Sequence, residues 1–298
     1  MRHHGLEALA PRTRRLAIIG DTQSTALVER LVGLEQNAHH RPRIFAEMAR
    51  RMPDAVLHLG DLVTYGSSDA HWQRLDGELA AFRDHGIPIL PAVGNHDRML
   101  LSRLGLSRLR ARFPALAERT WYSFRHAGVA FIALDSNLGL AERVALREQQ
   151  RWLDDTLAHA DADPEVRAII AYWHHPPFTN SRLVRPSALA RDRFVPALAA
   201  SSKALAIFSG HCHAFEHFRE HGLDCFVSGG GGGPRHLLET RPHRWRSRDH
   251  FAGGPKRFLH FIELALTPES VTVEVIRFDH DRGGFDTAAA AVLAHRAR

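Results

Sequence analysis

The sequence predicts an α/β protein in which a parallel sheet is covered by helices, and three observations support this fold class. Residues 16–19, 55–59 and 87–93 are short apolar runs that predict buried strands. Stretches with helical periodicity, at about residues 24–52 and 69–84, separate these runs. Polar residues follow each run directly. This alternation of strand and helix is typical of a βαβαβ unit, whose strands are parallel.

The second half of the chain predicts a mixture of hairpins, strands and helices. A hairpin is expected at 121–126 and 129–135, a helix at 142–159, a strand at 166–173, a helix at 187–200, a strand at 204–208, a hairpin at 215–220 and 223–227, and a β pair at 257–266 and 270–278. The basic segment 235–256 predicts a long surface loop, and the alanine-rich tail from residue 288 predicts a short or frayed helix. No linker or repeat divides the chain, so we expect one domain over residues 1–298 with its core at about 16–278.

Composition indicates a globular protein and gives little support for a nucleic-acid partner. The hydrophobic content is 44%, the charged content 24% and the formal net charge +6. Lys203 and Lys256 are the two lysines, and the abundant, scattered arginines suggest a compositional bias more than a binding face. Cys212 and Cys225 are too few for a disulfide framework. No secretory signal or membrane-spanning run is visible, so we expect a cytoplasmic protein without a membrane partner.

Several metal-ligand residue types stand where predicted strands end. Parallel strands bring their carboxyl ends to one edge of a sheet, where α/β proteins bind ligands. Carboxylate, amide and imidazole donors suit Mn, Fe or Zn, and so many donors suit a pair of ions that share one carboxylate. The candidate ligands are Asp21, Asp61, Asn95, His174, His211 and His213.

The ordered set of these segments resembles the calcineurin-like metallophosphoesterase superfamily. The resemblance covers about residues 16–278 and is closest to the purple acid phosphatase-like and cyclic-nucleotide phosphodiesterase-like branches. The motifs that carry it are Gly20-Asp21, Gly60-Asp61, Gly94-Asn95-His96-Asp97, His174-His175-Pro176-Pro177 and Gly210-His211-Cys212-His213. It implies a four-layer α/β-β/α sandwich of two mixed sheets flanked by helices, with two divalent or trivalent metal ions at the strand ends.

The resemblance also implies a role for each residue. Asp61 would bridge the ions, Asp21 and His213 would hold the first, and Asn95, His174 and His211 would hold the second. His96 would be the catalytic histidine beside the leaving group, and Asp97 would orient it. His175 would lie beside the ligands.

The first metal site departs from the commoner family pattern. Many members have a histidine two residues after the first aspartate, where this chain has Gln23, a weaker ligand. Tyr65 could instead supply a phenolate, as a tyrosine does in purple acid phosphatases. There the tyrosine is three residues after the bridging aspartate, whereas Tyr65 is four residues after Asp61.

The expected function is hydrolysis of a phosphomonoester or phosphodiester by in-line attack of metal-bound hydroxide on a small phosphorylated substrate. Two alternatives stay open: a nuclease acting on DNA or RNA, and a metal-binding scaffold of the same fold without turnover. Arginines that follow the glycine run 229–233 are expected to help bind an anionic substrate. They are Arg235, Arg241, Arg244, Arg246 and Arg248.

Overall fold

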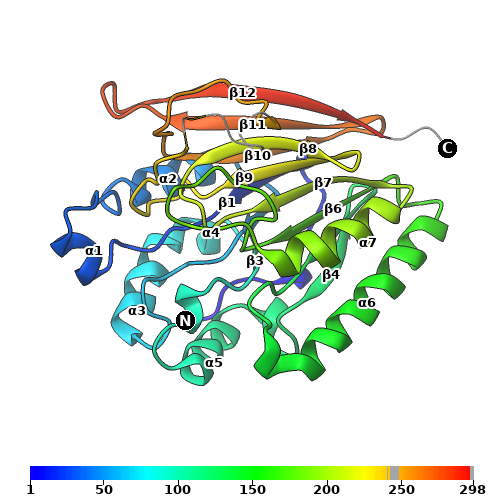
Figure 1. Ribbon diagram of the computed structural model, residues 1–298, viewed down its shortest axis with the longest axis horizontal. Helices are drawn as coiled ribbons and strands as arrows, with labels where there is room; N and C mark the ends of the chain where they lie inside the picture. Colours follow the sequence, from blue (N-terminus) through cyan, green and yellow to red (C-terminus); the bar gives the residue numbers. More distant parts are fainter. Residues whose placement is uncertain (240, 242–247, 296–298) are drawn as a thin grey trace.

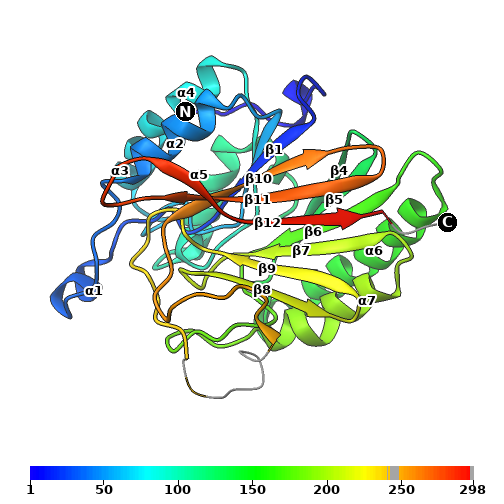
Figure 2. The same ribbon diagram turned by 90° about the horizontal axis from the view of Figure 1, so that it is seen from above.

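The computed structural model describes residues 1–239, 241 and 248–295, which fold into two packed, mixed six-stranded sheets. The sheets lie face to face between two groups of helices, which gives the four layers α/β-β/α (Figures 1 and 2). The predicted fold class is therefore confirmed.

The first sheet is formed by both ends of the chain. In spatial order it contains β12 (Phe285–Ala294), β11 (Ser270–Phe278), β10 (His260–Leu266), β1 (Arg15–Ile19), β2 (Ala55–His58) and β3 (Ile89–Pro91). Strands β1, β2 and β3 run parallel, whereas β10, β11 and β12 pair antiparallel. This half of the sheet contains the predicted βαβαβ unit.

The second sheet is formed by the middle of the chain. In spatial order it contains β4 (Tyr122–His126), β5 (Val129–Ala133), β6 (Ala168–Trp173), β7 (Ala204–Ser209), β9 (Leu223–Ser228) and β8 (Phe215–Glu220). Strands β5, β6, β7 and β9 run parallel, and the two predicted hairpins form its antiparallel edges.

Helices cover the outer face of each sheet. The first sheet carries α2 (Arg41–Arg50), α3 (Asp69–Glu78), α4 (Ala80–Asp84) and α5 (Ser102–Arg112), and the second carries α6 (Arg143–Ala162), a π-helical turn (Ala190–Phe194) and α7 (Val195–Ala200). The short helix α1 (Leu27–Leu31) projects from the body beside the ligand loops (Figures 1 and 2).

Alternating side chains of the second sheet fill two separate apolar layers. Phe131 and Ile170 pack between the sheets, whereas Ile132 and Ile169 pack against α6 and α7. A strand buried on both faces reads as a continuous apolar run, which explains why the sequence shows these strands so clearly.

Two expectations from the sequence concern the alanine-rich tail and the basic loop. The tail expected to be helical is instead β12, which pairs with β11 along its whole length. Of the arginines of the basic loop, Arg244 and Arg246 lie outside the described residues.

Cys212 and Cys225 are buried and free of disulfides, and no described helix is long and apolar enough to span a bilayer.

Candidate metal centre

The strand register brings the predicted ligands to one end of the two sheets. In the first sheet Ile19 pairs with His58, and His58 pairs with Pro91. In the second sheet Trp173 pairs with Ser209. The segments that follow these strands carry all six predicted ligands, and they meet where the two sheets face each other.

Three of the ligand residues occupy the left-handed region of the backbone map. The φ angles of Asp21, Asp61 and His211 are 59°, 56° and 66°. This conformation is uncommon for residues other than glycine and costs free energy, so it persists where the surrounding structure enforces it. Here it turns each side chain sharply from the end of its strand into the site.

Glycines allow the ligand loops to approach one another closely. A Cβ atom on Gly94 would lie 2.1 Å from the backbone nitrogen of Asp61, and one on Gly60 would lie 2.9 Å from Nδ1 of His174. In the glycine run, a Cβ on Gly233 would lie 2.7 Å from the ring of His213. These glycines therefore leave the space in which the ligands converge.

One ligand set forms around His174. Its Nδ1 lies 2.9 Å from the carbonyl oxygen of Leu59, which can only accept, so Nδ1 carries a proton. Its Nε2 then faces two further oxygens, Asn95 Oδ1 at 2.9 Å and Asp61 Oδ2 at 3.2 Å. Three atoms with lone pairs meet here, and this requires a proton or a cation between them.

A second set forms around His213 in the same way. Its Nδ1 lies 2.8 Å from the carbonyl oxygen of Pro234, which leaves Nε2 to face Asp21 Oδ1 at 3.4 Å. The Gln23 amide lies 3.0 Å from this Nε2. In the orientation that satisfies its hydrogen bonds, the amide nitrogen donates to backbone carbonyls of Asp21 and Asp61, and the oxygen faces His213.

Asp61 lies between the two sets. Its Oδ2, which is 3.2 Å from His174 Nε2, is also 3.4 Å from the end of the Gln23 amide that faces His213. The ligand atoms of Asp21, Asp61 and His174 all lie within 4.8 Å of one another. Asp61 is thus placed to contact an ion in either set.

The spacing of these atoms fits metal coordination. Two ligands about 2.1 Å from one ion, at angles of about 90–109°, are about 3.0–3.4 Å apart. The contacts of His174 and His213 described above span 2.9–3.4 Å. These separations are in the range expected for ligands of one metal ion.

The charges of the site also fit cations. Burial alone would lower the pKa of His174, but the Asp61 carboxylate raises it to about 9. Burial would also lower the pKa of His213, but the Asp21 carboxylate outweighs this effect and the pKa is raised. In the absence of metal, protons on these rings balance the carboxylates, and a bound cation would replace them.

His211 and His175 extend the second set. The backbone N–H of His211 donates to both oxygens of the Asp21 carboxylate at 2.9 Å. A ring nitrogen of His211 lies within 4.8 Å of ring nitrogens of both His174 and His175. Because Nδ1 of His175 contacts Ser136 Oγ at 2.9 Å, its other nitrogen is the one available to the site.

His96 is held beside Asp61 by contacts that the sequence did not predict. Its backbone N–H donates to Asp61 Oδ1 at 2.7 Å, and its Nδ1 lies 2.9 Å from the carbonyl oxygen of Thr64. The Thr64 carbonyl therefore orients the ring and leaves Nε2 as the free end.

Asp97 does not orient His96 through its side chain, and this expectation is corrected. Its buried carboxylate accepts hydrogen bonds from the backbone N–H groups of Asp61, Leu62 and Gly94 at 3.0, 2.9 and 2.9 Å. It thus joins two ligand loops. A carboxylate that satisfies several buried N–H groups fixes the backbone that carries Asp61.

Tyr65 lies in a different environment from the ligands. Its ring stacks on His71 with a centroid distance of 5.5 Å, and it lines a pocket beside the site. Among the described residues, no contact joins its phenol to the ligand sets. Gln23, and not Tyr65, thus lies beside His213.

Sequence reasoning missed His236, which is buried against the first set. Its ring stacks on that of His213 with a centroid distance of 4.2 Å, and its Nδ1 accepts the His213 backbone N–H at 3.3 Å. The only available signal was its position shortly after the glycine run, inside a segment predicted to be a surface loop.

Comparison with known proteins agrees with the observed fold. A family model described as calcineurin-like phosphoesterase matches residues 14–215. The chain belongs to this family. No curated protein sequence gives a significant match.

Solved structures with the same fold have low sequence identity to this chain. Purple acid phosphatase PPD1 from yellow lupin (Lupinus luteus) is 16% identical with a TM-score of 0.70, over 96% of this chain and 54% of that chain. The chain therefore spans about half the length of the lupin protein. A dimetal phosphatase from Danio rerio is 15% identical with a TM-score of 0.63, over 94% and 98% of the two chains. GAP50 of Plasmodium, described as the anchor in the inner membrane complex, is 15% identical with a TM-score of 0.70, over 95% and 89%.

Proposed function

We propose that this protein hydrolyses a phosphate ester with the help of two metal ions. The observation that carries the proposal is the position of Asp61 Oδ2, between His174 Nε2 at 3.2 Å and the Gln23 amide at 3.4 Å. A carboxylate that faces two ligand sets can serve both ions of a two-metal site. The similarity of the fold to two phosphatases supports the same proposal.

The chain would supply both the ion sites and a proton donor. Asp21, Gln23 and His213 would hold the first ion, and Asn95, His174 and His211 the second, with Asp61 in common. Two cations there would polarise the phosphoryl oxygens and lower the pKa of the attacking water.

His96 would act on the leaving group. Hydrolysis forms a bond from the water oxygen to phosphorus and breaks the bond to the ester oxygen, which must then gain a proton. With Nδ1 held by Thr64, the Nε2 of protonated His96 is free to give that proton. The products are an alcohol and a phosphate with one ester bond fewer.

The substrate we propose is a small molecule, not DNA or RNA. Of the described loop arginines, Arg235 pairs with Glu35, Arg241 with Glu239 and Arg248 with Glu220. Their charge is thus partly neutralised, which weakens the case for a nucleic-acid surface.

The buried free thiols of Cys212 and Cys225 suit the cytoplasm, where we place the protein.

The test is turnover by protein of known metal content. Purified protein, loaded in turn with Mn, Fe and Zn and analysed by mass spectrometry for bound metal, should hydrolyse members of a panel of phosphomonoesters, phosphodiesters and cyclic nucleotides. Two bound ions without turnover of any substrate would favour a scaffold. Cleavage of DNA or RNA above that of all small esters would favour a nuclease.

A further inference from the structure

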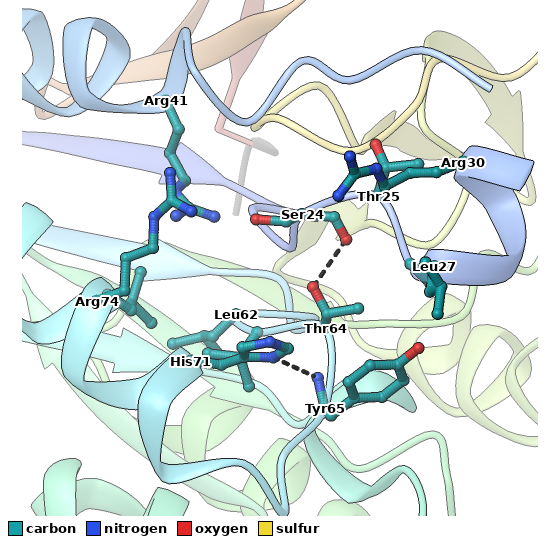
Figure 3. Close-up of a pocket in the computed structure, with 13 residues that line it drawn as sticks. Ser24, Thr25, Leu27, Arg30, Arg41, Leu62, Thr64, Tyr65, His71 and Arg74 are labelled. Carbon is teal, nitrogen blue, oxygen red and sulfur yellow. Dashed lines mark hydrogen bonds between the residues drawn. The ribbon is translucent and has the colours of Figure 1, made fainter. Parts of the chain in front are cut away.

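A pocket of about 290 Å³ opens beside the metal centre (Figure 3). One wall is the segment after β1, from Ser24 to Arg30, and the opposite wall is the segment after β2, from Leu62 to Tyr65. Ser24 directly follows Gln23 and Leu62 directly follows Asp61, and successive Cα atoms are about 3.8 Å apart. The pocket walls therefore begin where the ligand loops leave the site.

The two walls are joined to each other and to His96. Thr64 Oγ1 donates to the carbonyl oxygen of Ser24 at 2.7 Å, and the carbonyl of Thr64 orients the His96 ring. The pocket therefore lies on the side of the site that carries His96, because Thr64 lines the pocket and contacts the His96 ring.

The pocket carries an excess of positive charge. Its thirteen lining residues include three arginines, but no aspartate or glutamate. Buried Arg41 is neutralised by Glu78, with Arg41 Nη2 2.8 Å from Glu78 Oε1, and Arg74 shares the same carboxylate at 3.1 Å. Arg30 has no ion pair among the described residues. One carboxylate therefore faces two of the three guanidinium groups, and the third has none in the described part of the chain.

Part of the pocket is apolar. Leu27, which is 64% exposed, and the Tyr65 ring, which stacks on His71, both line the pocket (Figure 3). Ligand pockets are commonly lined by apolar and aromatic side chains beside a few polar groups. The pocket thus offers guanidinium groups and an apolar surface together.

We propose that this pocket binds the leaving-group part of the substrate, and that this part carries a second anionic group, a carboxylate or a phosphate, on an apolar or aromatic frame. Arg30 and Arg74 bind the anion, because guanidinium groups match the planar, bidentate geometry of these oxyanions. Leu27 and Tyr65 contact the frame. The inference rests on the proposed hydrolysis and adds the substrate class.

The experiment compares esters of similar shape that differ in this charge. The Mn-loaded protein is assayed with 4-carboxyphenyl phosphate and with 4-carbamoylphenyl phosphate, whose leaving groups are similar in shape. The compound 4-(phosphonomethyl)phenyl phosphate tests phosphate in place of carboxylate. We expect kcat/KM to be roughly 10-fold or more higher for an anionic ester than for the amide. The ratio should fall to within about twofold of one when Arg30→Gln and Arg74→Gln are combined.

A matched control separates local binding from the general field of the protein. Arg147→Gln combined with Arg151→Gln removes the same charge from the exposed face of α6, on the opposite side of the molecule from α1 (Figure 1). This control should keep the wild-type ratio. A wild-type ratio near one, a ratio unchanged by the pocket variants, or an equal fall in the control would each overturn the inference.

A binding arm keeps this test independent of turnover. Isothermal titration with 4-carboxybenzylphosphonate and 4-carbamoylbenzylphosphonate, which cannot be hydrolysed, should show the same preference and the same loss in the pocket variants. If no ester is hydrolysed, the proposed function fails while the titration still decides the pocket. If esters are hydrolysed without preference for the anionic frame, only the inference fails.

Discussion

Replacing His96 by alanine should separate chemistry from metal binding. The ring contacts the Thr64 carbonyl, whereas the bond to Asp61 comes from the His96 backbone N–H, at 2.7 Å. The substitution removes the ring and keeps the backbone donor. We therefore expect the His96→Ala variant to bind the same number of ions as the wild type.

The size of the catalytic loss should depend on the leaving group. General acid catalysis contributes typically ~10²–10⁴-fold, and it matters most when the departing oxygen is strongly basic. For an alkyl phosphate we expect kcat/KM to fall by about 10²–10³-fold, or about 2.7–4 kcal/mol in transition-state free energy. For a nitrophenyl phosphate, whose leaving group needs no proton, we expect a fall of less than about 10-fold.

The assay is kcat/KM for both esters, with metal content measured on the same samples. His39→Ala, at an exposed histidine outside the site, is the matched control and should leave both rates unchanged. An equal loss for both esters would show that His96 does not protonate the leaving group. Loss of an ion from the variant would show that the ring, not the backbone, supports the site.

Three further predictions concern other residues. Gln23→His should tighten binding of the more weakly held ion by about 10–100-fold, because imidazole is a stronger ligand than an amide. Metal titration measures this affinity, and an unchanged value would mean that residue 23 does not contact an ion. Tyr65→Phe should change neither metal affinity nor the spectrum of the iron-loaded protein, and a charge-transfer band lost in this variant would restore Tyr65 as a ligand. Burial raises the pKa of Glu216 to about 7, above its ordinary 4.5, so its ionisation lowers the free energy of unfolding as the pH rises between these values. In urea unfolding, the free energy of unfolding of Glu216→Gln relative to that of the wild type should therefore rise by about 1–3 kcal/mol from pH 5 to pH 8. An unchanged difference would show that the carboxyl ionises freely.

The position of the candidate site could be predicted because strand and ligand are adjacent in the sequence. A buried strand shows as an apolar run, and the residue that follows it must lie at the sheet edge. The six ligand candidates all follow strands. Because parallel strands end at the same edge of a sheet, the parallel pairing was enough to predict where these residues meet. The roles of Asp97 and Thr64 could not be predicted in this way, because a carboxylate that accepts backbone N–H groups depends on how two loops pack.

The errors in the fold have a similar cause. Ala288 to Ala291 favour a helix by propensity, but pairing with β11 places them in a strand. The loop arginines appeared free in the sequence, whereas Arg235 meets Glu35, which is 200 positions away along the chain. His236 packs on His213 only because the glycine run folds back over the site. Contacts between distant segments decide each of these cases.

The central claim is that Asp61 joins two metal ions, and electron paramagnetic resonance of the Mn-loaded protein tests it most directly. Two Mn ions bridged by one carboxylate, ~3.5–4 Å apart, are magnetically coupled and differ in spectrum from isolated ions. We predict two Mn ions per chain by elemental analysis, a coupled spectrum in the wild type, and loss of the coupling in Asp61→Asn. A spectrum of isolated Mn in the fully loaded wild type, or coupling that survives in Asp61→Asn, would contradict the account.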